Sequence, residues 1–208
     1  VEGLEVAEQI SQTPLDANGR LTTRIPITKA TVRDTPPPSA VPFTTSTVEE
    51  LASYRATLTT TMGDIVIGFA PDVAPEHVRN FLRLAQSGVY DGTGFHRVVP
   101  KFAVQAGDLS SRLAPLTQVQ RKVVGTVKGE FNALKHEPGI VSMARGDDPD
   151  SATTSFFIVT APTPSLDGKY TAFGRVLQGL GVVTAIEQAP VDGETPRTRI
   201  GITRVTLA

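Results

Sequence analysis

Short runs of alternating apolar and polar residues fill the chain from Arg55 onward. Ala56–Thr61 is followed, after Met62 and Gly63, by Asp64–Phe69, and the two runs predict a β-hairpin. Alternate positions of the second run are apolar, so one face of that strand should be buried. Further runs of the same length and character follow at Phe95–Val99, Phe102–Ala106, Ile140–Ala144, Phe156–Thr160, Thr171–Val176 and Ile200–Leu207.

Two segments show a helical pattern instead. Pro75 suits the first turn of a helix, and Gly88 suits the position just beyond its end. The apolar residues between them recur at i, i+3, i+4 and i+7 and form one stripe: Val78, Phe81, Leu82 and Ala85. A second, shorter helix is predicted over Leu180–Gln188. Together the runs indicate a mainly β fold, a closed eight-stranded antiparallel β-barrel capped by two α-helices.

The first 33 residues repeat the pattern of the C-terminal end. Val1–Val32 aligns with Leu177–Leu207 at one constant offset, and after a one-residue slip in the turn Ile25 meets Ile200. We therefore expect residues 1–33 to form a helix–strand extension that resembles the tail of a preceding copy of the domain, cut at a boundary within a two-copy parent. Chance similarity between two helix–turn–strand units is the alternative.

The predicted organisation is an extension at 1–33, a linker at 34–53 and a domain at 54–208. The linker contains four prolines within Asp34–Thr47, which favours extended polyproline geometry and a semi-rigid spacer. Its X-Pro bonds could also serve as substrate for the neighbouring domain, although an ordinary linker is the favoured interpretation. The apolar face of the extension should pack on the barrel, pair with a strand edge or exchange with a second chain, so self-association stays open.

Composition removes several classes of function. The net charge of -1 offers no basic surface for nucleic acid, and no apolar run approaches the ~18 residues needed for a membrane span. The absence of cysteine excludes thiol catalysis, disulfides and cysteine-ligated zinc. The cellular compartment stays open between the cytoplasm and export with removal of a signal.

The usual motifs for hydrolysis, phosphoryl transfer and hydride transfer do not occur in the sequence. The three histidines lack metal-ligand spacing, and the acidic cluster at 147–150 lacks the glycine and distal glutamate of a calcium loop. We expect no cofactor and no metal. Arg97 is the unusual residue, because an arginine within an apolar strand is costly unless it has a partner or a function. Taken alone, such an arginine is more typical of a salt bridge.

Five segments nevertheless resemble the cyclophilin-type peptidyl-prolyl cis/trans isomerases, in family order and over about 150 residues. The bacterial-type members are the most similar. The segments are Pro75–Phe81 with Gly88–Tyr90, Gly94–Asp108 (GFHRVVPKFAVQAGD), Gly139–Arg145 (GIVSMAR), Ser151–Ile158 (SATTSFFI) and Leu166–Val176 (LDGKYTAFGRV).

This resemblance implies rotation of X-Pro bonds in proline-containing polypeptides, and with it assistance to protein folding, in a groove on the outside of the barrel. Arg97 matches the catalytic arginine, and Phe102, Phe157 and Leu166 match the walls of the proline pocket. Gln105 matches a groove glutamine that could hold Arg97 or a substrate carbonyl. The expected substrate-binding residues are His96, Phe102, Ala103, Gln105, Arg145, Ser155, Phe157, Leu166 and Tyr170. For His96 a packing role is the alternative.

The sequence departs from the family pattern at several of these positions. Ala103 replaces a common methionine, which predicts a wider and shallower pocket, and Ser155 replaces a glutamine. Tyr170 stands where many members have histidine, and Arg145 where eukaryotic members have asparagine; bacterial members share both. Ser165 stands where tryptophan supports cyclosporin binding, so we expect weak cyclosporin affinity. A non-catalytic module that binds proline-containing segments and a tandem structural protein remain the alternatives.

Overall fold

A computed structural model describes residues 4–27 and 41–208. The chain divides into two compact units, Val1–Ser39 and Ala40–Ala208. No helix in the described ranges is long and apolar enough to cross a membrane.

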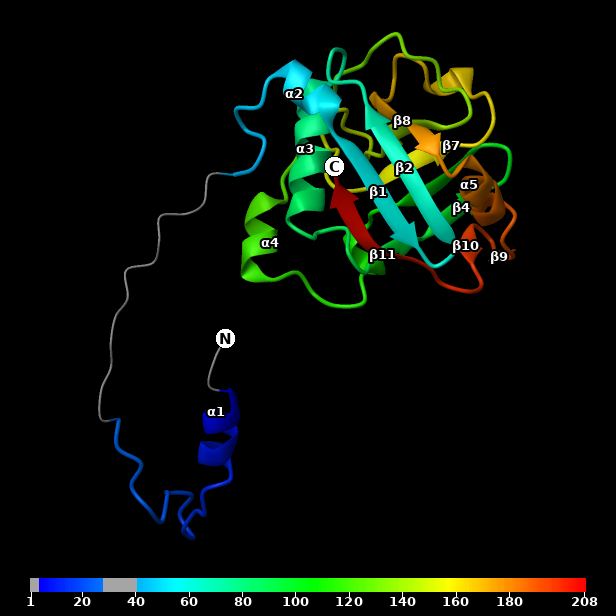
Figure 1. Cartoon of the computed structure of the whole chain (residues 1–208). Helices are drawn as coiled ribbons and strands as arrows, with labels where there is room; N and C mark the ends of the chain where they lie inside the picture. Colours follow the sequence, from blue (N-terminus) through cyan, green and yellow to red (C-terminus); the bar gives the residue numbers. More distant parts are fainter. Residues whose placement is uncertain (1–3, 28–40) are drawn as a thin grey trace. The chain divides into compact units, whose positions relative to one another are not determined.

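The larger unit is built on one antiparallel sheet that curls into a nearly closed barrel (Figure 1). Its strands follow the order β3-β11-β1-β2-β8-β6-β7-β5-β4. The two end strands, β3 and β4, are separated along the chain by His96 alone, so the backbone itself joins the edges of the sheet. The strands are β1 Arg55–Thr60, β2 Gly63–Phe69, β3 Gly94–Phe95, β4 Arg97–Val99, β5 Ala103–Ala106, β6 Ile140–Met143, β7 Phe156–Val159, β8 Ala172–Gln178 and β11 Ile200–Leu207.

The predicted mainly β barrel is confirmed, with one difference in the count of strands. The expected strand Phe95–Val99 is divided at His96 into β3 and β4, which pair with different neighbours, β11 and β5. At that residue the chain passes from one edge strand of the sheet to the other. Periodicity cannot reveal such a division, because the apolar run itself is continuous.

The two predicted helices are present and lie on opposite sides of the barrel (Figure 1). They are α3, Pro75–Gln86, and α5, Leu180–Glu187. The apolar stripe of α3 is fully buried, and Phe81 lies at its centre, with its ring 4.9 Å from Tyr90 and 5.4 Å from Phe156. Close aromatic packing of this kind contributes about 0.5–1.5 kcal/mol per pair beyond simple burial. The core therefore fills the barrel and fixes its strands.

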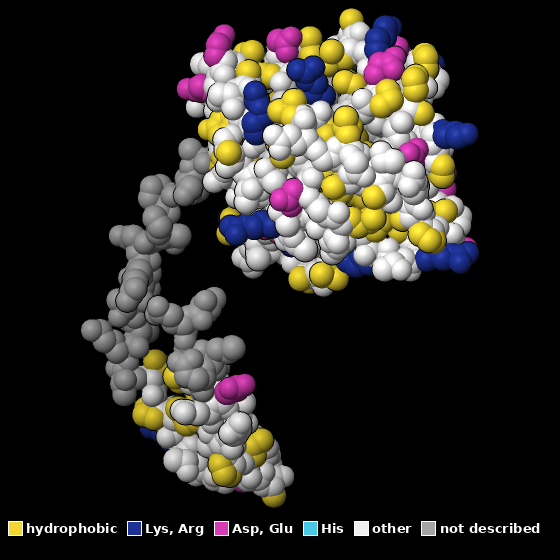
Figure 2. All heavy atoms as spheres, turned by 45° about the vertical axis from the view of Figure 1, so that its right-hand side comes forward, with side chains coloured by type: hydrophobic (Ala, Val, Ile, Leu, Met, Phe, Trp, Pro, Cys, Tyr) yellow, Lys and Arg dark blue, Asp and Glu magenta, His cyan; other side chains and the backbone are white. Residues whose placement is uncertain are grey.

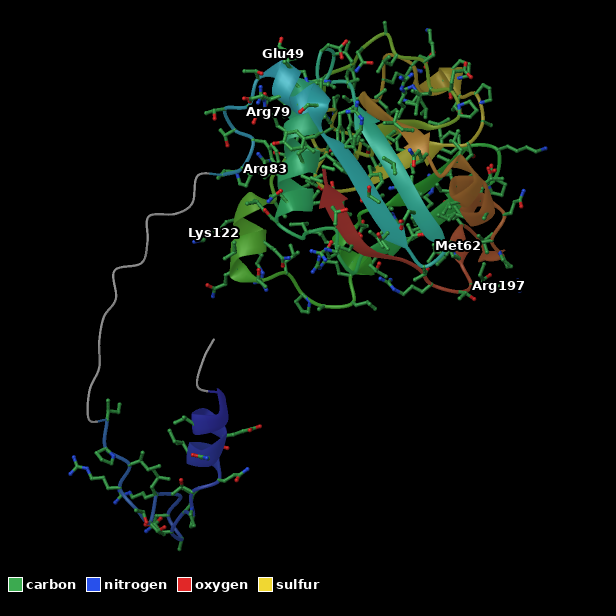
Figure 3. The ribbon with its side chains drawn as sticks, viewed as in Figure 1. Glu49, Met62, Arg79, Arg83, Lys122 and Arg197 are labelled. Atoms are coloured by element: carbon green, nitrogen blue, oxygen red, sulfur yellow. The ribbon has the colours of Figure 1, made fainter. Side chains whose placement is uncertain are left out.

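The predicted linker at 34–53 is wrong at its C-terminal end. Residues 48–53 form a further helix, α2 (Val48–Ser53), whose Leu51 is completely buried in the core of the barrel unit. Arg79 of α3 also donates hydrogen bonds to the carbonyls of Phe43 and Ser46 and so holds the preceding segment (Figure 3). The prolines at 36–38 lie outside the described residues.

A capping box defines the start of α2. A second capping box defines the start of another helix that was not predicted, α4 (Gln118–Val123). In α2 the Thr47 side chain accepts from the N–H of Glu50, whose carboxylate accepts from the N–H of Thr47. The Thr-x-x-Glu pattern in the sequence is typical of a capping box at the start of a helix. Six-residue helices are too short to show periodicity, so the cap was the available signal.

The smaller unit reproduces part of the C-terminal end of the larger one. Its helix α1, Leu4–Ser11, begins and ends at the residues that the repeat aligns with the ends of α5. An isolated bridge joins Leu15 to Leu21, at the positions that match the pair Val191–Pro196 in the larger unit. The repeat in the sequence is therefore also a repeat of local structure.

The strand predicted within this extension does not form over its described residues. Ile25 and Ile27 have no regular structure and are 39% and 88% exposed, whereas the matching Ile200 and Ile202 in β11 are 4% and 0% exposed. Strand β11 forms because β1 and β3 supply its hydrogen-bond partners. The described residues of the extension include no such neighbours. Residues 28–33 lie outside the described ranges.

Candidate active site

Four strands bring a row of residues together on the outer face of the barrel. In register, Arg97 of β4 lies opposite Gln105 of β5, Gln105 opposite Phe157 of β7, and Phe157 opposite Ser142 of β6. Directly opposed residues point to the same face of a sheet. Residues separated by up to 60 positions in the sequence are thus aligned across the sheet.

The turn between β4 and β5 fixes this register. Lys101 adopts the left-handed conformation, with φ 57°, and the N–H of Phe102 donates to the carbonyl of Val99 at 3.2 Å. The N–H of Lys101 also donates to the Glu187 carboxylate of α5 at 2.7 Å. The hairpin that carries Arg97 is therefore held at its tip by a helix.

A small apolar cluster forms outside the main core at this row. Ala103, Phe157 and Val159 are its buried members. Half-buried residues from the start of β6 and from neighbouring turns and loops surround them: Phe102, Ile140, Ala144, Leu166 and Tyr170. Leu166 ends the 3₁₀ turn η2, Pro164–Leu166, and the ring of Tyr170 meets that of Phe157 edge-on at 5.8 Å. The cluster leaves a hollow above it.

That hollow is a pocket of about 160 Å³. It is lined by eight of the predicted site residues together with Ala144: Arg97, Phe102, Ala103, Gln105, Arg145, Phe157, Leu166 and Tyr170. Ser155 lines an adjoining groove that shares Gln105 and Arg145 with the pocket. His96 lines neither of these two hollows. Its predicted place in the groove stays a prediction.

His96 instead lies half-buried at the division between β3 and β4. Its Nδ1 has no hydrogen-bond partner in the described ranges. Burial lowers the pKa of His96, although the nearby Asp108 carboxylate opposes this. A neutral imidazole here suits packing better than binding. Ser165, where weak cyclosporin binding was predicted, is exposed beside Leu166, and that expectation stays a prediction.

The guanidinium of Arg97 is held at the surface. Its side chain is 38% exposed and forms a two-point ion pair with Glu194, with Nε 2.5 Å from Oε2 and Nη2 3.1 Å from Oε1. Hydrogen bonds from Arg97 lower the pKa of the Glu194 carboxyl. The expected holder, Gln105, makes no hydrogen bond to Arg97 among the described residues. Nothing in the sequence around Arg97 indicates Glu194, which is 97 residues away in the chain.

Phe157 is supported from behind by a buried polar chain that sequence analysis also missed. The imidazole of His136 stacks on the Phe157 ring, with centroids 6.2 Å apart. Its Nδ1 lies 3.0 Å from Asp167 Oδ1 and must donate, because a carboxylate only accepts. In a neutral ring Nε2 then accepts from the Ser142 hydroxyl at 3.1 Å. The backbone and ring N–H groups of His136 lower the pKa of Asp167 to about 2.

Asp167, His136 and Ser142 have the order of a hydrolytic triad, but Ser142 is completely buried. A nucleophile must reach the carbonyl that it attacks, so this serine cannot act on a substrate in the groove. The three residues instead fix the orientation of the imidazole beneath Phe157. They form a structural support for one wall of the pocket.

Arg145 lines the pocket beside Tyr170. Its guanidinium lies 4.6 Å from the ring centroid of Tyr170, within the range of a cation–π contact. It also donates to the carbonyl of Lys169 at 3.0 Å and to that of Gly146 at 2.7 Å. The arginine is thus held as part of the wall.

The chemistry available here is a fixed cation beside an apolar hollow. Within 4–27 and 41–208, no group of three or more His, Cys, Asp or Glu side chains is placed to hold a metal ion. The pocket contains no exposed nucleophile paired with a base. It could hold an apolar ring and offer hydrogen bonds from a permanent charge, and such donors act on developing charge without proton transfer.

Comparisons with known proteins agree on one family. Residues 55–207 match the family model described as cyclophilin type peptidyl-prolyl cis-trans isomerase/CLD. Peptidyl-prolyl cis-trans isomerase CYP23 of Arabidopsis thaliana is 40% identical over 147 residues, which cover 70% of this chain and 65% of that protein. Peptidyl-prolyl cis-trans isomerase A of Dickeya dadantii is 39% identical over 150 residues, covering 69% of this chain and 76% of the relative.

A solved structure is similar over the same region. The cyclophilin type peptidyl-prolyl cis-trans isomerase of Cryptosporidium parvum superposes with a TM-score of 0.65 at 28% identity, over 74% of this chain and 96% of its own. The chain spans slightly less than two thirds of the length of the Arabidopsis relative. The similarity is thus to the barrel unit.

Proposed function

This chain belongs to the cyclophilin-type peptidyl-prolyl cis-trans isomerase family, and we propose that it catalyses cis/trans isomerisation of X-Pro bonds with Arg97 as the catalytic residue. One observation carries the proposal: Arg97 lines the same surface pocket as Phe102 and Phe157. A charged donor and an apolar hollow therefore lie side by side. The proposed substrates are proline-containing polypeptides, and the proposed role is assistance to protein folding.

The reaction asks for little more than this arrangement. Rotation about a peptide bond breaks no covalent bond, and its barrier of about 18–20 kcal/mol comes from amide resonance. When the bond twists, the prolyl nitrogen becomes pyramidal and gains a lone pair. A donor that meets this nitrogen only in the twisted state lowers the barrier selectively. Arginine suits the task because it stays protonated at physiological pH.

The pocket provides the fixed point for the rotation. Phe102, Phe157 and Leu166 would hold the proline ring, while the segment before it turns. The side chain of Gln105, beside Arg97 in the row, could bind a substrate carbonyl. His136 stacks on Phe157 and is itself hydrogen-bonded to Asp167 and Ser142, so the Phe157 wall should hold the proline ring in place while the bond rotates. Each ~1.4 kcal/mol of selective stabilisation gives a tenfold increase in rate.

Two departures from the family pattern bear on substrate preference. Ala103 is 3% exposed and lines the pocket with a single methyl group. A methionine there would fill more of the hollow, so this pocket should hold proline less tightly. Ser155 offers a short hydroxyl in the adjoining groove. We expect a raised KM for small proline peptides.

A protease-coupled assay with a tetrapeptide that contains one X-Pro bond tests the proposal. The parent should accelerate isomerisation, and Arg97→Ala should lower kcat/KM by about 100-fold, as expected for loss of a key transition-state donor. Arg97→Lys should recover only part of the rate, because lysine keeps the charge without the planar fork.

Arg175→Ala is the matched control, since Arg175 is an exposed strand arginine in β8, outside the pocket. It should leave kcat/KM unchanged. A folded parent that binds proline peptides without accelerating isomerisation would overturn the proposal and favour the non-catalytic module.

A further inference from the structure

A short hairpin lies beside the strand that carries Arg97. Its strands are β9, Val191–Asp192, and β10, Thr195–Pro196. Gly193 opens the turn with φ 63°, a conformation that glycine adopts at little cost. Arg197, at the base of the hairpin, donates through its backbone N–H to the carbonyl of Pro190 at 2.9 Å and through Nε to that of Val191 at 3.2 Å (Figure 3).

The tip of this hairpin docks on the end strand of the sheet. β4 is the last strand in the sheet order, so one of its edges lacks a partner strand. The N–H of Val98 on that edge donates to the backbone carbonyl of Glu194 at 2.7 Å. The hairpin thus satisfies a backbone group of β4. This backbone hydrogen bond also places the Glu194 side chain beside Arg97, the residue that precedes Val98 in β4.

The ion pair uses one side of the guanidinium and leaves the other free. Glu194 takes Nε and Nη2 of Arg97, whereas Nη1 makes no hydrogen bond within the described part of the chain. Arg97 lines the pocket while it is held in this way. A two-point contact fixes the plane of a guanidinium as well as its position. The free nitrogen is therefore presented in one orientation.

Stability does not explain the pair. Arg97 and Glu194 are 38% and 53% exposed, and ion pairs at such exposure contribute little to folding. The exposed Asp192 lies in the same hairpin and forms no ion pair among the described residues, so it offers a carboxylate outside the pair for comparison. What the pair does determine is the orientation of Arg97.

We propose that Glu194 is a positioning residue for Arg97: it holds Nε and Nη2 from the β9–β10 hairpin and presents Nη1 to the bound X-Pro segment. This inference rests on the proposed function. A guanidinium oriented in advance loses less conformational freedom at the transition state, so Glu194 acts on kcat more than on the binding of the proline ring. The ring is bound by Phe102 and Phe157, which line the pocket, and Glu194 is not among the described residues that line it.

Steady-state kinetics of three variants test this role. Glu194→Ala removes the ion pair with Arg97 and should lower kcat about tenfold. KM should change less than about twofold, because the residues that line the pocket are unchanged. Glu194→Gln keeps the length and one acceptor oxygen and should recover an intermediate kcat. Asp192→Asn removes a negative charge from the same hairpin without breaking the pair and should behave as the parent. All should unfold at nearly the parent's temperature.

A second measurement detects the Arg97–Glu194 ion pair independently of activity. In ¹⁵N NMR spectra of the parent, the Arg97 side chain should show a shifted Nε–H signal and separate Nη signals, since the ion pair hinders rotation. Arg97→Lys assigns these signals by their loss. In Glu194→Ala they should move to the averaged position of exposed arginines such as Arg175.

The two measurements separate the inference from the proposed function. Averaged Arg97 signals in the parent would show that Glu194 does not hold the guanidinium in one orientation, whatever the activity, and would overturn the inference. Restrained signals with a parent-like or higher kcat in Glu194→Ala would overturn positioning, and a higher value would mean that the pair sequesters Arg97. If the parent itself is inactive while Arg97 is restrained, the proposed function fails, and with it a catalytic role for Glu194.

Discussion

Single residues in this site matter through the partners that hold them. Arg97 is oriented by Glu194, and Phe157 rests on His136, which Asp167 and Ser142 fix in turn. Both partners of the functional groups are polar and distant in the sequence. The resemblance identified the groups that face the pocket, but nothing in the local sequence indicated the groups behind them. Those contacts depend on which strands and loops pair in the folded chain, and local sequence patterns do not reveal pairings over such separations.

Asp167→Ala tests the support behind Phe157 through its pH dependence. The pKa of Asp167 is lowered to about 2, so its carboxylate stabilises the fold above its ordinary pKa of 3.8, and this contribution is lost as pH falls towards about 2. The variant should therefore be less stable than the parent at neutral pH, and the gap should close on acidification. Urea unfolding at several pH values measures it; a gap that stays constant with pH would contradict the account.

Among the elements, α3 shows most clearly what the sequence could and could not predict. Pro75, Gly88 and the apolar stripe predicted the helix, and α3 forms as Pro75–Gln86. Its N-terminus has no side-chain cap from its own N-cap residue, Ala74. Instead the distant Glu130 accepts from the backbone N–H groups of Glu76 and His77 at 3.1 and 2.9 Å. Local patterns reveal a helix, but not a cap supplied from another part of the chain.

Glu130→Ala should destabilise the protein by about 1–3 kcal/mol, because two N–H groups and the His77 ring lose their acceptor. Burial alone would raise the pKa of Glu130, but hydrogen bonds from His77 and Glu76 bring it below its ordinary value. Its contribution should accordingly be present at neutral pH and fade as pH falls through that lowered pKa. Denaturant unfolding measures the loss. Glu137→Ala, which removes an exposed carboxylate, is the control and should cost little.

The whole molecule consists of a barrel unit that contains every pocket residue and a smaller unit that repeats one end of it. The barrel followed from the strand runs and from the resemblance, whereas its joint at His96 did not. The alignment of α1 with α5 followed from the repeat, yet the described residues around Ile25 and Ile27 form no strand. A strand needs neighbouring strands as hydrogen-bond partners, and repeating the sequence of β11 does not supply copies of β1 and β3. Self-association through the extension stays a prediction.

Charged side chains of both signs are interspersed on the surface, with no large area of one sign on the face drawn (Figure 2).

Removal of residues 1–39 should leave catalysis and barrel stability intact. The barrel unit contains the whole core around Phe81 and the complete pocket, so the variant should keep the parent's kcat/KM and thermal midpoint. Side-by-side assays and calorimetry check this. A loss of more than about tenfold in kcat/KM would show that the smaller unit takes part in the site.

The central claim is that the Arg97 guanidinium lowers the barrier to X-Pro rotation. Two-dimensional exchange NMR of a proline peptide at equilibrium, with a catalytic amount of the chain, tests it without protease or coupling steps. We predict exchange cross-peaks between the cis and trans signals with the parent, and their loss with Arg97→Ala although the peptide still binds. Equal exchange with both proteins, or none with a parent that binds the peptide, would contradict the account.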